Sequence, residues 1–536
     1  MSVPNPTMII GSSYLLYLAY NTALNSNGAF GAFEGFINGP VFSGYRSAVK
    51  QLLKNSSYKP LAADGVTRRT LPDSKTPPIY KAPPLSAHEC ASLQPIKVRG
   101  LTLRNRVIRG AAFDGTEVSQ MVKTHEDVAA GGVGMTVVAY CSVARDGRTF
   151  EGQIVLRDVE DARARLRPVV DACHKHGAAI CSQLTHAGSF AERPVIKEQQ
   201  VSASAVFNIA GLDFPRAATK ADIARLVDDF AHGAIVAVRE IGFDAVELHC
   251  GHGYLLSQWM SPFHNRRTDE YGGSALNRAR FPTMCLRAVR QALGPDVPIL
   301  VKINANDGIN AGLELPDALV MAEEFANNGA DVLVVTCGNV SQNGMFMLRG
   351  ASNVDKLALG LPGAGMKMLT AVFGPWMVPE TPFETCFLRH EARSVLERVR
   401  GKALVCLMGG VDSLGELEGA MAEGFSFVQM IRPLIREPDF LLRVRKELAE
   451  RTAAAAAAAK TVGQTDAADA EEAFDVTSKC IRCNMCVIAS VDPDRVFGCP
   501  FRNMEVARQG QLSVSPAMAR AMVPDLEDGL CQRPKL

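Results

Sequence analysis

The chain has 536 residues, more than one ordinary compact domain contains, and its 57 basic and 56 acidic side chains give a net charge of +1. This balance argues against a nucleic-acid surface or a polybasic membrane anchor, and the hydrophobic fraction of 47% is that of a globular protein. A (β/α)₈ barrel of about 250 residues with added segments fits this length.

Neither end of the chain carries a clear targeting or membrane segment. Residues 1–90 form an extension, and its apolar stretch Met8–Ala23 lacks the basic start of a signal peptide. We expect a helix docked on the protein, with an uncleaved targeting segment as the alternative, and no membrane span. The ending Pro534-Lys535-Leu536 weakly resembles a peroxisomal address, so a peroxisome-like organelle is the alternative to a cytoplasmic location.

Short apolar runs alternate with amphipathic stretches of helical length, such as Lys220–Ile241. The runs predict eight buried strands, at Val107–Ala111, Met135–Ala139, Ala178–Leu184, Ala245–His249, Ile299–Asn304, Val332–Thr336, Ala403–Met408 and Phe427–Met430. Buried strands that alternate with helices are typical of a parallel sheet, and this number of units favours a closed α/β TIM barrel over residues 91–450.

Segments outside this pattern divide the rest of the chain. The long connection Gly338–Lys402 follows the C-terminal end of the sixth strand, where we expect it to cover a substrate. Residues 451–473, with the alanine run Ala453–Ala459, form a linker that is helical in part. A short cysteine-cluster segment at 474–508 and a tail at 509–536 follow.

Polar side chains gather where the predicted strands end, which is the active face of a TIM barrel. The third strand ends at Gln183, the fourth runs from His249 to His252 and Tyr254, and the fifth carries Lys302. The seventh and eighth strands end in Gly409-Gly410 and Ile431-Arg432, where such barrels commonly bind a phosphate.

The stretch from Leu93 to Glu450 resembles the old yellow enzyme family of FMN-dependent oxidoreductases, and most closely the branch that includes bacterial 2,4-dienoyl-CoA reductase. The strongest passage runs from His249-Cys250-Gly251-His252-Gly253-Tyr254 through Asn265-Arg266-Arg267-Thr268-Asp269-Glu270-Tyr271-Gly272-Gly273. Supporting motifs are Leu103-Arg104-Asn105-Arg106, Gly131-Gly132-Val133-Gly134, Gln183-Leu184-Thr185-His186-Ala187-Gly188 and Gly409-Gly410-Val411.

The resemblance implies a role for each matching position. His249 and His252 grip the carbonyl oxygen of the substrate, and Tyr254 donates the proton. Gln183 bonds the flavin pyrimidine edge, and Lys302 stabilises the anionic reduced flavin. Gly410 and Arg432 bind the FMN phosphate. The other implied contacts to FMN are made by Ala111, Ala112, Gly409 and Ile431.

The implied reaction is NADH- or NADPH-driven reduction of an activated C=C bond in a small enone or enoyl substrate. An NADH oxidase, a dehydrogenase or demethylase, and a low-turnover flavin or iron–sulfur electron carrier are the alternatives. No Gly-x-Gly-x-x-Gly fingerprint follows the cysteines, so nicotinamide reduces FMN at the barrel mouth or a partner protein feeds in electrons. Whether the chain forms a homo-oligomer stays open.

Three positions depart from the family pattern, and several of the predicted site residues could have a purely structural role instead. Phe113 stands where relatives often have a Thr or Cys that tunes the flavin, Ile431 replaces a glycine, and Ser189 replaces an arginine. Lys302 could pair with a barrel carboxylate, and Tyr140 at the end of the second strand could do no more than pack on the flavin. Arg432 could instead cap a helix or pair with Asp439.

Four cysteines are clustered near the C-terminus as Cys480-x₂-Cys483-x₂-Cys486-x₁₂-Cys499, followed by Pro500. Thiolates at such spacing indicate a metal site, because each close pair can present both sulfurs to one centre. The spacing and the Cys-Pro ending favour a [4Fe–4S] cluster, with structural zinc and a metal-free cluster as alternatives. The dienoyl-CoA reductase branch also carries a cluster after its barrel.

Overall fold

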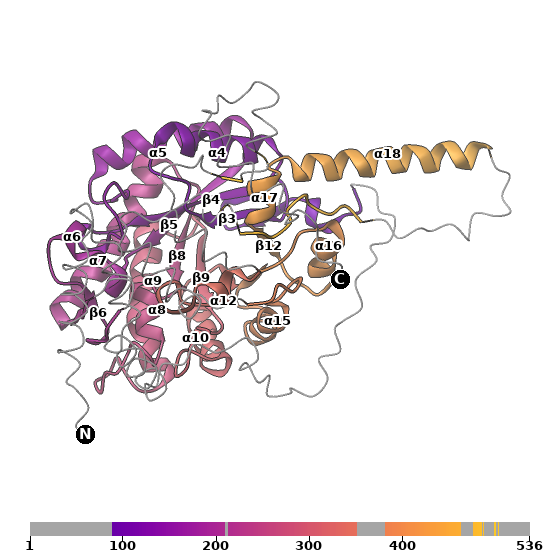
Figure 1. Cartoon of the computed structure of the whole chain (residues 1–536). Helices are drawn as coiled ribbons and strands as arrows, with labels where there is room; N and C mark the ends of the chain where they lie inside the picture. The colour runs from indigo at the N-terminus through magenta and orange to yellow at the C-terminus, as the bar shows by residue number, and fades with distance from the viewer. Residues whose placement is uncertain are drawn as a thin grey trace, which may run out of the picture.

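A computed structural model of the chain describes residues 88–208, 213–350, 381–461, 475–484, 486, 498, 499 and 502. Eight parallel strands in the order β10-β11-β12-β3-β4-β5-β8-β9 close into a barrel, around which the helices form an outer layer (Figure 1). The predicted TIM barrel is therefore confirmed. The expected N-terminal helix and the C-terminal tail lie outside the described residues.

The barrel strands fall where the apolar runs predict them. Their bounds are β3 Val107–Ala112, β4 Met135–Ser142, β5 Ala179–Thr185, β8 Ala245–Cys250, β9 Ile299–Asn304, β10 Val332–Thr336, β11 Leu404–Met408 and β12 Phe427–Met430. Small strands outside the barrel are β1 Ile96–Val98, β2 Leu101–Leu103, β6 Val201–Ser202 and β7 Arg216–Ala217. The antiparallel β1–β2 hairpin packs against the barrel interior through Val98 and Leu103.

The interior of the barrel has an apolar part and a polar part. The apolar part is a cluster of inward side chains that includes Ile108, Met135, Val137, Cys181, Leu300, Val334, Cys406 and Phe427. Side chains one inward step further along the strands are polar, and Gln183, Glu247, Lys302 and Gln429 are all buried there. Because alternate strand residues face inward, one end of the barrel is packed shut and the other carries chemistry.

The outer layer consists of helices that follow the strands. The longer ones are α4 Val118–Ala130, α5 Val159–Lys175, α7 Lys220–Ile235, α9 Ala275–Leu293, α10 Leu315–Asn327, α15 Arg389–Arg398, α16 Leu414–Ala422 and α18 Phe440–Thr461. Helix α7 begins with a capping box between Thr219 and Asp222 and continues as the π-helical turn η4, Val236–Ile241. The predicted helical stretch Lys220–Ile241 is thus one continuous helical segment.

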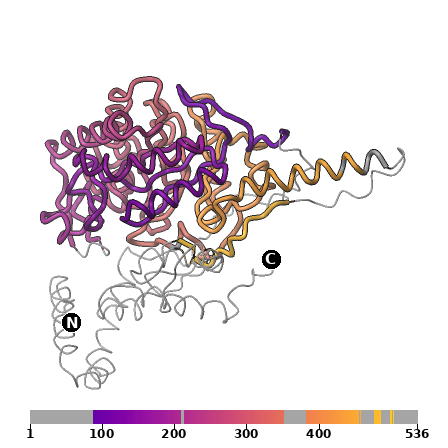
Figure 2. The backbone as a smooth tube through the Cα atoms, turned by 90° about the horizontal axis from the view of Figure 1, so that it is seen from above, coloured from indigo at the N-terminus to yellow at the C-terminus, as the bar shows by residue number. Residues whose placement is uncertain are grey.

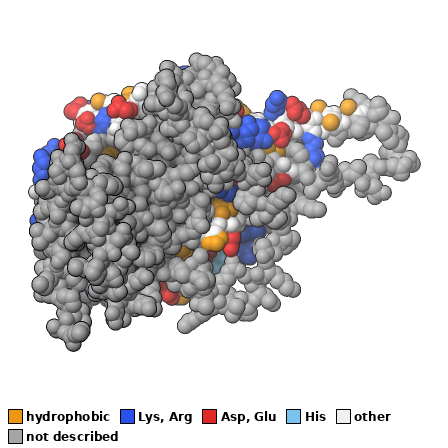
Figure 3. Space-filling view, in the orientation of Figure 1, with side chains coloured by type: hydrophobic (Ala, Val, Ile, Leu, Met, Phe, Trp, Pro, Cys, Tyr) orange, Lys and Arg blue, Asp and Glu red, His pale blue; other side chains and the backbone are white. Residues whose placement is uncertain are grey.

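Short helices complete the loops at the two barrel ends. They are η1 Ala91–Leu93, η2 Arg145–Gly147, η3 Gly188–Phe190, α6 Arg193–Ile196, α8 Leu255–Met260, α11 Val340–Asn343, α12 Met345–Leu348 and α17 Arg432–Arg436. Helix α18 takes up the alanine run and projects from the barrel in both ribbon views (Figures 1 and 2). On the face shown in Figure 3, basic and acidic side chains of the described residues are interspersed.

Candidate functional site

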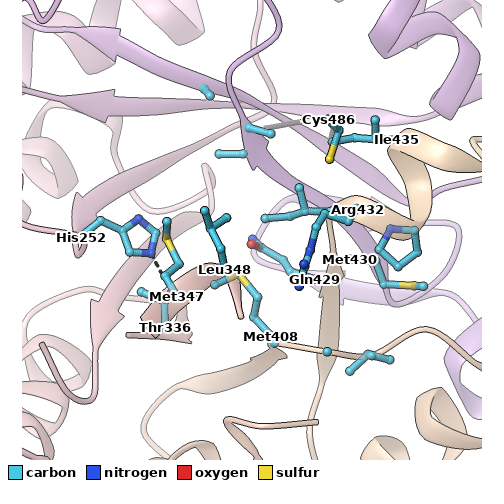
Figure 4. A pocket seen from close by; sticks show the side chains of 18 of the residues that line it. His252, Thr336, Met347, Leu348, Met408, Gln429, Met430, Arg432, Ile435 and Cys486 are labelled. Atoms are coloured by element: carbon cyan, nitrogen blue, oxygen red, sulfur yellow. Dashed lines mark hydrogen bonds between the residues drawn. The ribbon is translucent and has the colours of Figure 1, made fainter. Parts of the chain in front are cut away.

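One cavity of about 280 Å³ opens at the C-terminal ends of the barrel strands (Figure 4). It gathers side chains from most strands and from the later segments of the chain. The site residues predicted from the sequence that line it are Ala111, Ala112, Gln183, His249, His252, Tyr254, Lys302, Gly409, Gly410, Ile431, Arg432, Cys480 and Cys486. Of the predicted set, Cys483 and Cys499 are not among the residues that line this cavity.

The connection after the sixth strand also reaches this cavity. Val340, Met347, Leu348, Phe383 and Phe387 lie on its wall, all from the described parts of Gly338–Lys402. The expectation that this connection covers the site agrees with their position. Residues 351–380 lie outside the described part of the chain.

The two histidines contact each other at one end of the cavity. His249 is the last residue but one of β8, and its Nε2 lies 3.0 Å from Nδ1 of His252. Nε2 of His252 lies 2.8 Å from Oγ1 of Thr336 (Figure 4). His252 has a left-handed φ of 61°, and its backbone N–H donates to Oδ1 of Asn304 over 3.1 Å. That hydrogen bond holds the turn that brings the second ring back beside the first.

Both histidine rings are neutral at ordinary pH. Burial, then the neighbouring His252 and Lys302, lower the pKa of His249 well below its usual value, and burial and Lys302 lower that of His252 to about 3. Nδ1 of His249 is buried and has no hydrogen-bond partner among the described residues. The pair therefore holds spare hydrogen-bonding capacity for a bound oxygen.

Tyr254 precedes α8 and packs between aromatic rings. Its ring centroid lies 4.5 Å from that of His249 and 5.6 Å from those of Tyr140 and Phe190. Burial, and then the adjacent Tyr140, raise the pKa of Tyr254 well above its usual value. The phenol is therefore protonated at neutral pH, as a proton donor must be. Phe113 lies on the same wall and packs on Phe150 with centroids 5.2 Å apart.

Lys302 both lines the cavity and pairs with a barrel carboxylate. Its Nζ lies 3.1 Å from Oε1 of Glu247, a fully buried residue on β8 that also accepts a hydrogen bond from Nε2 of Gln183 over 2.7 Å. Glu247 and its third partner, Gln429, were not among the site residues predicted from the sequence. The signal was available, because each lies two residues before a predicted site residue, His249 or Ile431, and so on the same strand face.

The opposite end of the cavity is formed by the turns after β11 and β12. Gly409 and Gly410 have φ values of 100° and 85°, and a Cβ on Gly410 would lie 2.7 Å from the carbonyl oxygen of Glu384. Only glycine fits such a close approach in this conformation. Arg432 donates to the carbonyl oxygen of Arg349 over 3.2 Å and to Oδ1 of Asn484, and among the described residues it forms no ion pair with Asp439.

The cysteine cluster adjoins this end. Burial raises the pKa of Cys486 to about 12, Arg432 lowers it, and the thiols of Cys480, Cys499 and Cys483 raise it further, so these three thiols lie within electrostatic reach of Cys486. Across the described ranges, however, no three His, Cys, Asp or Glu side chains are arranged to hold a metal ion.

No described helix is long and apolar enough to cross a membrane.

The lining of the cavity suits FMN. The buried Oε1 of Gln429 has no hydrogen-bond partner within the described part of the chain, and it can serve as an acceptor for a ring N–H. The Lys302 ammonium offers a cation for an anionic reduced ring, and Gly410 and Arg432 offer a cradle and a charge for a phosphate.

Comparisons with known proteins identify the family of the chain. Residues 93–345 match the NADH:flavin oxidoreductase / NADH oxidase family. The chain is 36% identical over 363 residues to 4,4'-dithiodibutanoate disulfide reductase of Rhodococcus erythropolis, covering 66% of this chain and 88% of that one. It is 36% identical over 254 residues to an NADPH dehydrogenase of Geobacillus thermodenitrificans, covering 46% and 72% of the two chains.

Solved structures share the fold at lower identity. A 2-naphthoyl-CoA reductase is 21% identical with a TM-score of 0.59, and the match covers 81% of this chain but only 58% of that one. An old yellow enzyme homologue from Zymomonas mobilis is 20% identical with a TM-score of 0.52, over 67% and 93% of the two chains. The chain belongs to the NADH:flavin oxidoreductase / NADH oxidase family, as an FMN-dependent NAD(P)H oxidoreductase with an old yellow enzyme barrel.

Proposed function

We propose that the protein reduces the C=C bond of α,β-unsaturated carbonyl or enoyl compounds. The convergence of His249, His252 and Tyr254 on the cavity that Gln183 and Lys302 also line supports this assignment. A mere electron carrier needs neither an oxygen-binding pair nor a buried protonated phenol. FMN held by Lys302, Gly410 and Arg432 would supply the hydride for this reduction, which it would take from NADH or NADPH.

Each side chain then has one task in the reaction. Neutral imidazoles of His249 and His252 donate hydrogen bonds to the substrate carbonyl oxygen and polarise the double bond. For that oxygen to bind between them, the His249–His252 contact must open. Tyr254 transfers its phenolic proton to the α-carbon, and the aromatic wall of Phe113, Tyr140 and Tyr254 excludes water.

Phenol binding tests the histidine pair directly. Para-substituted phenols should produce a long-wavelength charge-transfer band with the flavin, and the His249→Ala/His252→Ala variant should lose it. His174→Ala is the matched control, because His174 pairs with Asp244 on the surface at 40% side-chain exposure. Unchanged phenol binding in the double variant would refute the assignment of the pair.

An anaerobic substrate screen tests the reaction class. Enones and enoyl-CoA esters should reoxidise the reduced protein, and the product should carry one new hydrogen at each former alkene carbon. Failure of every activated alkene, with rapid reoxidation by oxygen alone, would favour the NADH oxidase alternative instead.

Reduction of an organic disulfide is a second candidate. It rests on the 36% identity to a disulfide reductase over 88% of that relative. Hydride would add to one sulfur of R–S–S–R to release one thiol, and Tyr254 would protonate the departing thiolate to give the second. Comparing kcat/KM for 4,4'-dithiodibutanoate with that for a simple enone distinguishes the two functions.

We further propose that Cys480, Cys483, Cys486 and Cys499 form a redox centre of the iron–sulfur type beside the flavin site. The position of Cys480 and Cys486 on the cavity wall supports it, as does the effect of the other three thiols on the pKa of Cys486. Iron, sulfide and zinc analysis of anaerobically prepared protein tests this assignment. Stoichiometric zinc would replace it with a structural site, and no metal in the isolated holoprotein would contradict it.

A further inference from the structure

Glu247 stands at the centre of the polar layer of the barrel. Its side chain is fully buried on β8, above the apolar interior cluster, and no residue role discussed so far accounts for it. Burying a carboxylate away from water costs folding free energy unless other groups compensate its charge. Three hydrogen-bond donors compensate the charge of Glu247.

The donors come from three different strands. Nε2 of Gln183 donates to Oε1 over 2.7 Å, Nε2 of Gln429 donates to Oε2 over 3.1 Å, and Nζ of Lys302 lies 3.1 Å from Oε1. An ionised carboxylate accepts hydrogen bonds and donates none, which matches this set. Both amide nitrogens thus turn toward Glu247, and the carbonyl oxygen of Gln429 stays unpaired among the described residues at the cavity wall.

The Lys302–Glu247 pair has no net charge, although Lys302 lines the flavin cavity. A lone lysine would strongly favour the anionic reduced form of a flavin over the neutral oxidised form. A carboxylate 3.1 Å from the ammonium opposes that preference in a site shielded from water. We propose that Glu247 is a positioning residue that limits the electron affinity of the bound flavin by offsetting the charge of Lys302.

The test is a flavin reduction potential, measured on holoprotein variants. Glu247→Gln keeps the shape and an acceptor oxygen but removes the charge, and it should favour the reduced flavin at least tenfold, about 30 mV for a two-electron couple. Glu247→Asp keeps the charge and should shift the potential less. Lys302→Met should shift it in the opposite direction, toward the oxidised flavin.

The double variant Glu247→Gln/Lys302→Met separates this role from a structural one. It removes both charges, so its potential should return to within about threefold of the parent equilibrium, or about 14 mV. Asp114→Asn is the matched control, because Asp114 is a buried carboxylate paired with Arg109 and His125 outside the cavity lining. That variant should lose stability and leave the potential unchanged.

Two results would overturn the proposal. One is a Glu247→Gln protein that binds FMN with an unchanged potential, and the other is a double variant whose potential stays displaced tenfold or more. The double variant leaves no unpaired buried charge, so it carries the test if Glu247→Gln does not fold. The identity of the alkene or disulfide substrate does not enter either measurement.

Discussion

The two ends of the cavity are built in opposite ways. At one end, His249, His252 and Tyr254 come from a single stretch that passes from β8 into α8. At the other, Arg432 meets Arg349 and Asn484, which lie 83 and 52 residues away in the sequence. The local end holds groups suited to proton transfer and oxygen binding, whereas the composite end holds groups suited to an anion and to thiols. Substitutions at the two ends should therefore affect different steps.

The largest expected effect is on the local end, from Tyr254→Phe. Loss of the phenolic proton should slow alkene reduction by about 10²–10⁴-fold, because general acid catalysis is worth that much. Reduction of the flavin by NADH or NADPH should keep its rate. Stopped-flow measurement of the two half-reactions separates these steps.

Tyr140→Phe is the matched control for that variant, because Tyr140 packs on Tyr254 in the same wall and also carries a phenol, which is half-buried. It should retain most of the alkene reduction. Equal losses in both half-reactions of Tyr254→Phe would contradict the division between the ends.

The next effect is on the composite end, from Arg432→Met. A charge-assisted hydrogen bond contributes about 1.5–3 kcal/mol, so FMN affinity should fall by roughly 10–150-fold. Titration of apoprotein with FMN, followed by flavin fluorescence, measures this loss. Arg398→Met removes an exposed arginine that pairs with Glu323 and should leave the affinity unchanged. An unaltered affinity in Arg432→Met would place the phosphate elsewhere.

A smaller effect comes from the neutral histidines of the local end. Burial lowers the pKa of His252 to about 3, so the unfolded chain binds the extra proton more readily than the folded protein. Above about pH 6.5 the ring is neutral in both the folded and the unfolded chain, so His252 does not reduce the free energy of unfolding. Below that pH the free energy of unfolding falls, because only the unfolded chain binds the proton. At pH 5.5 the loss is about 1.4 kcal/mol.

His252→Asn should remove that part of the acid sensitivity, and asparagine tolerates the left-handed backbone at this position. Urea unfolding at several pH values measures the difference between variant and parent. Parallel pH profiles for the two proteins would show that His252 is not the group responsible.

The same contrast explains what the sequence could reveal. All eight strands were predictable, because runs such as Val332–Thr336 are largely apolar and buried on both faces. His249, His252 and Tyr254 were predictable as a group, since few residues separate them and the strand end fixes where they face. The spacing of two residues places Glu247 on the same strand face as His249. Its partners Gln183, Lys302 and Gln429 were not predictable, because only barrel closure brings them together. The partners of Arg432 were equally hidden, because the Arg349–Asn484 contact joins two irregular segments.

The smallest expected effect is that of a substitution at the composite end on phenol binding at the local end. Cys480→Ser/Cys486→Ser changes the thiol wall of the cavity and leaves the oxygen-binding pair intact. Phenol affinity should therefore stay within about twofold of the parent value, because substitutions at separate places act almost independently. If the thiols hold a redox centre, the same variant should lose electron transfer to a one-electron acceptor such as ferricenium while NAD(P)H still reduces the flavin. A large loss of phenol affinity would instead mean that the cysteine segment shapes the substrate end, so that the two ends act as one unit.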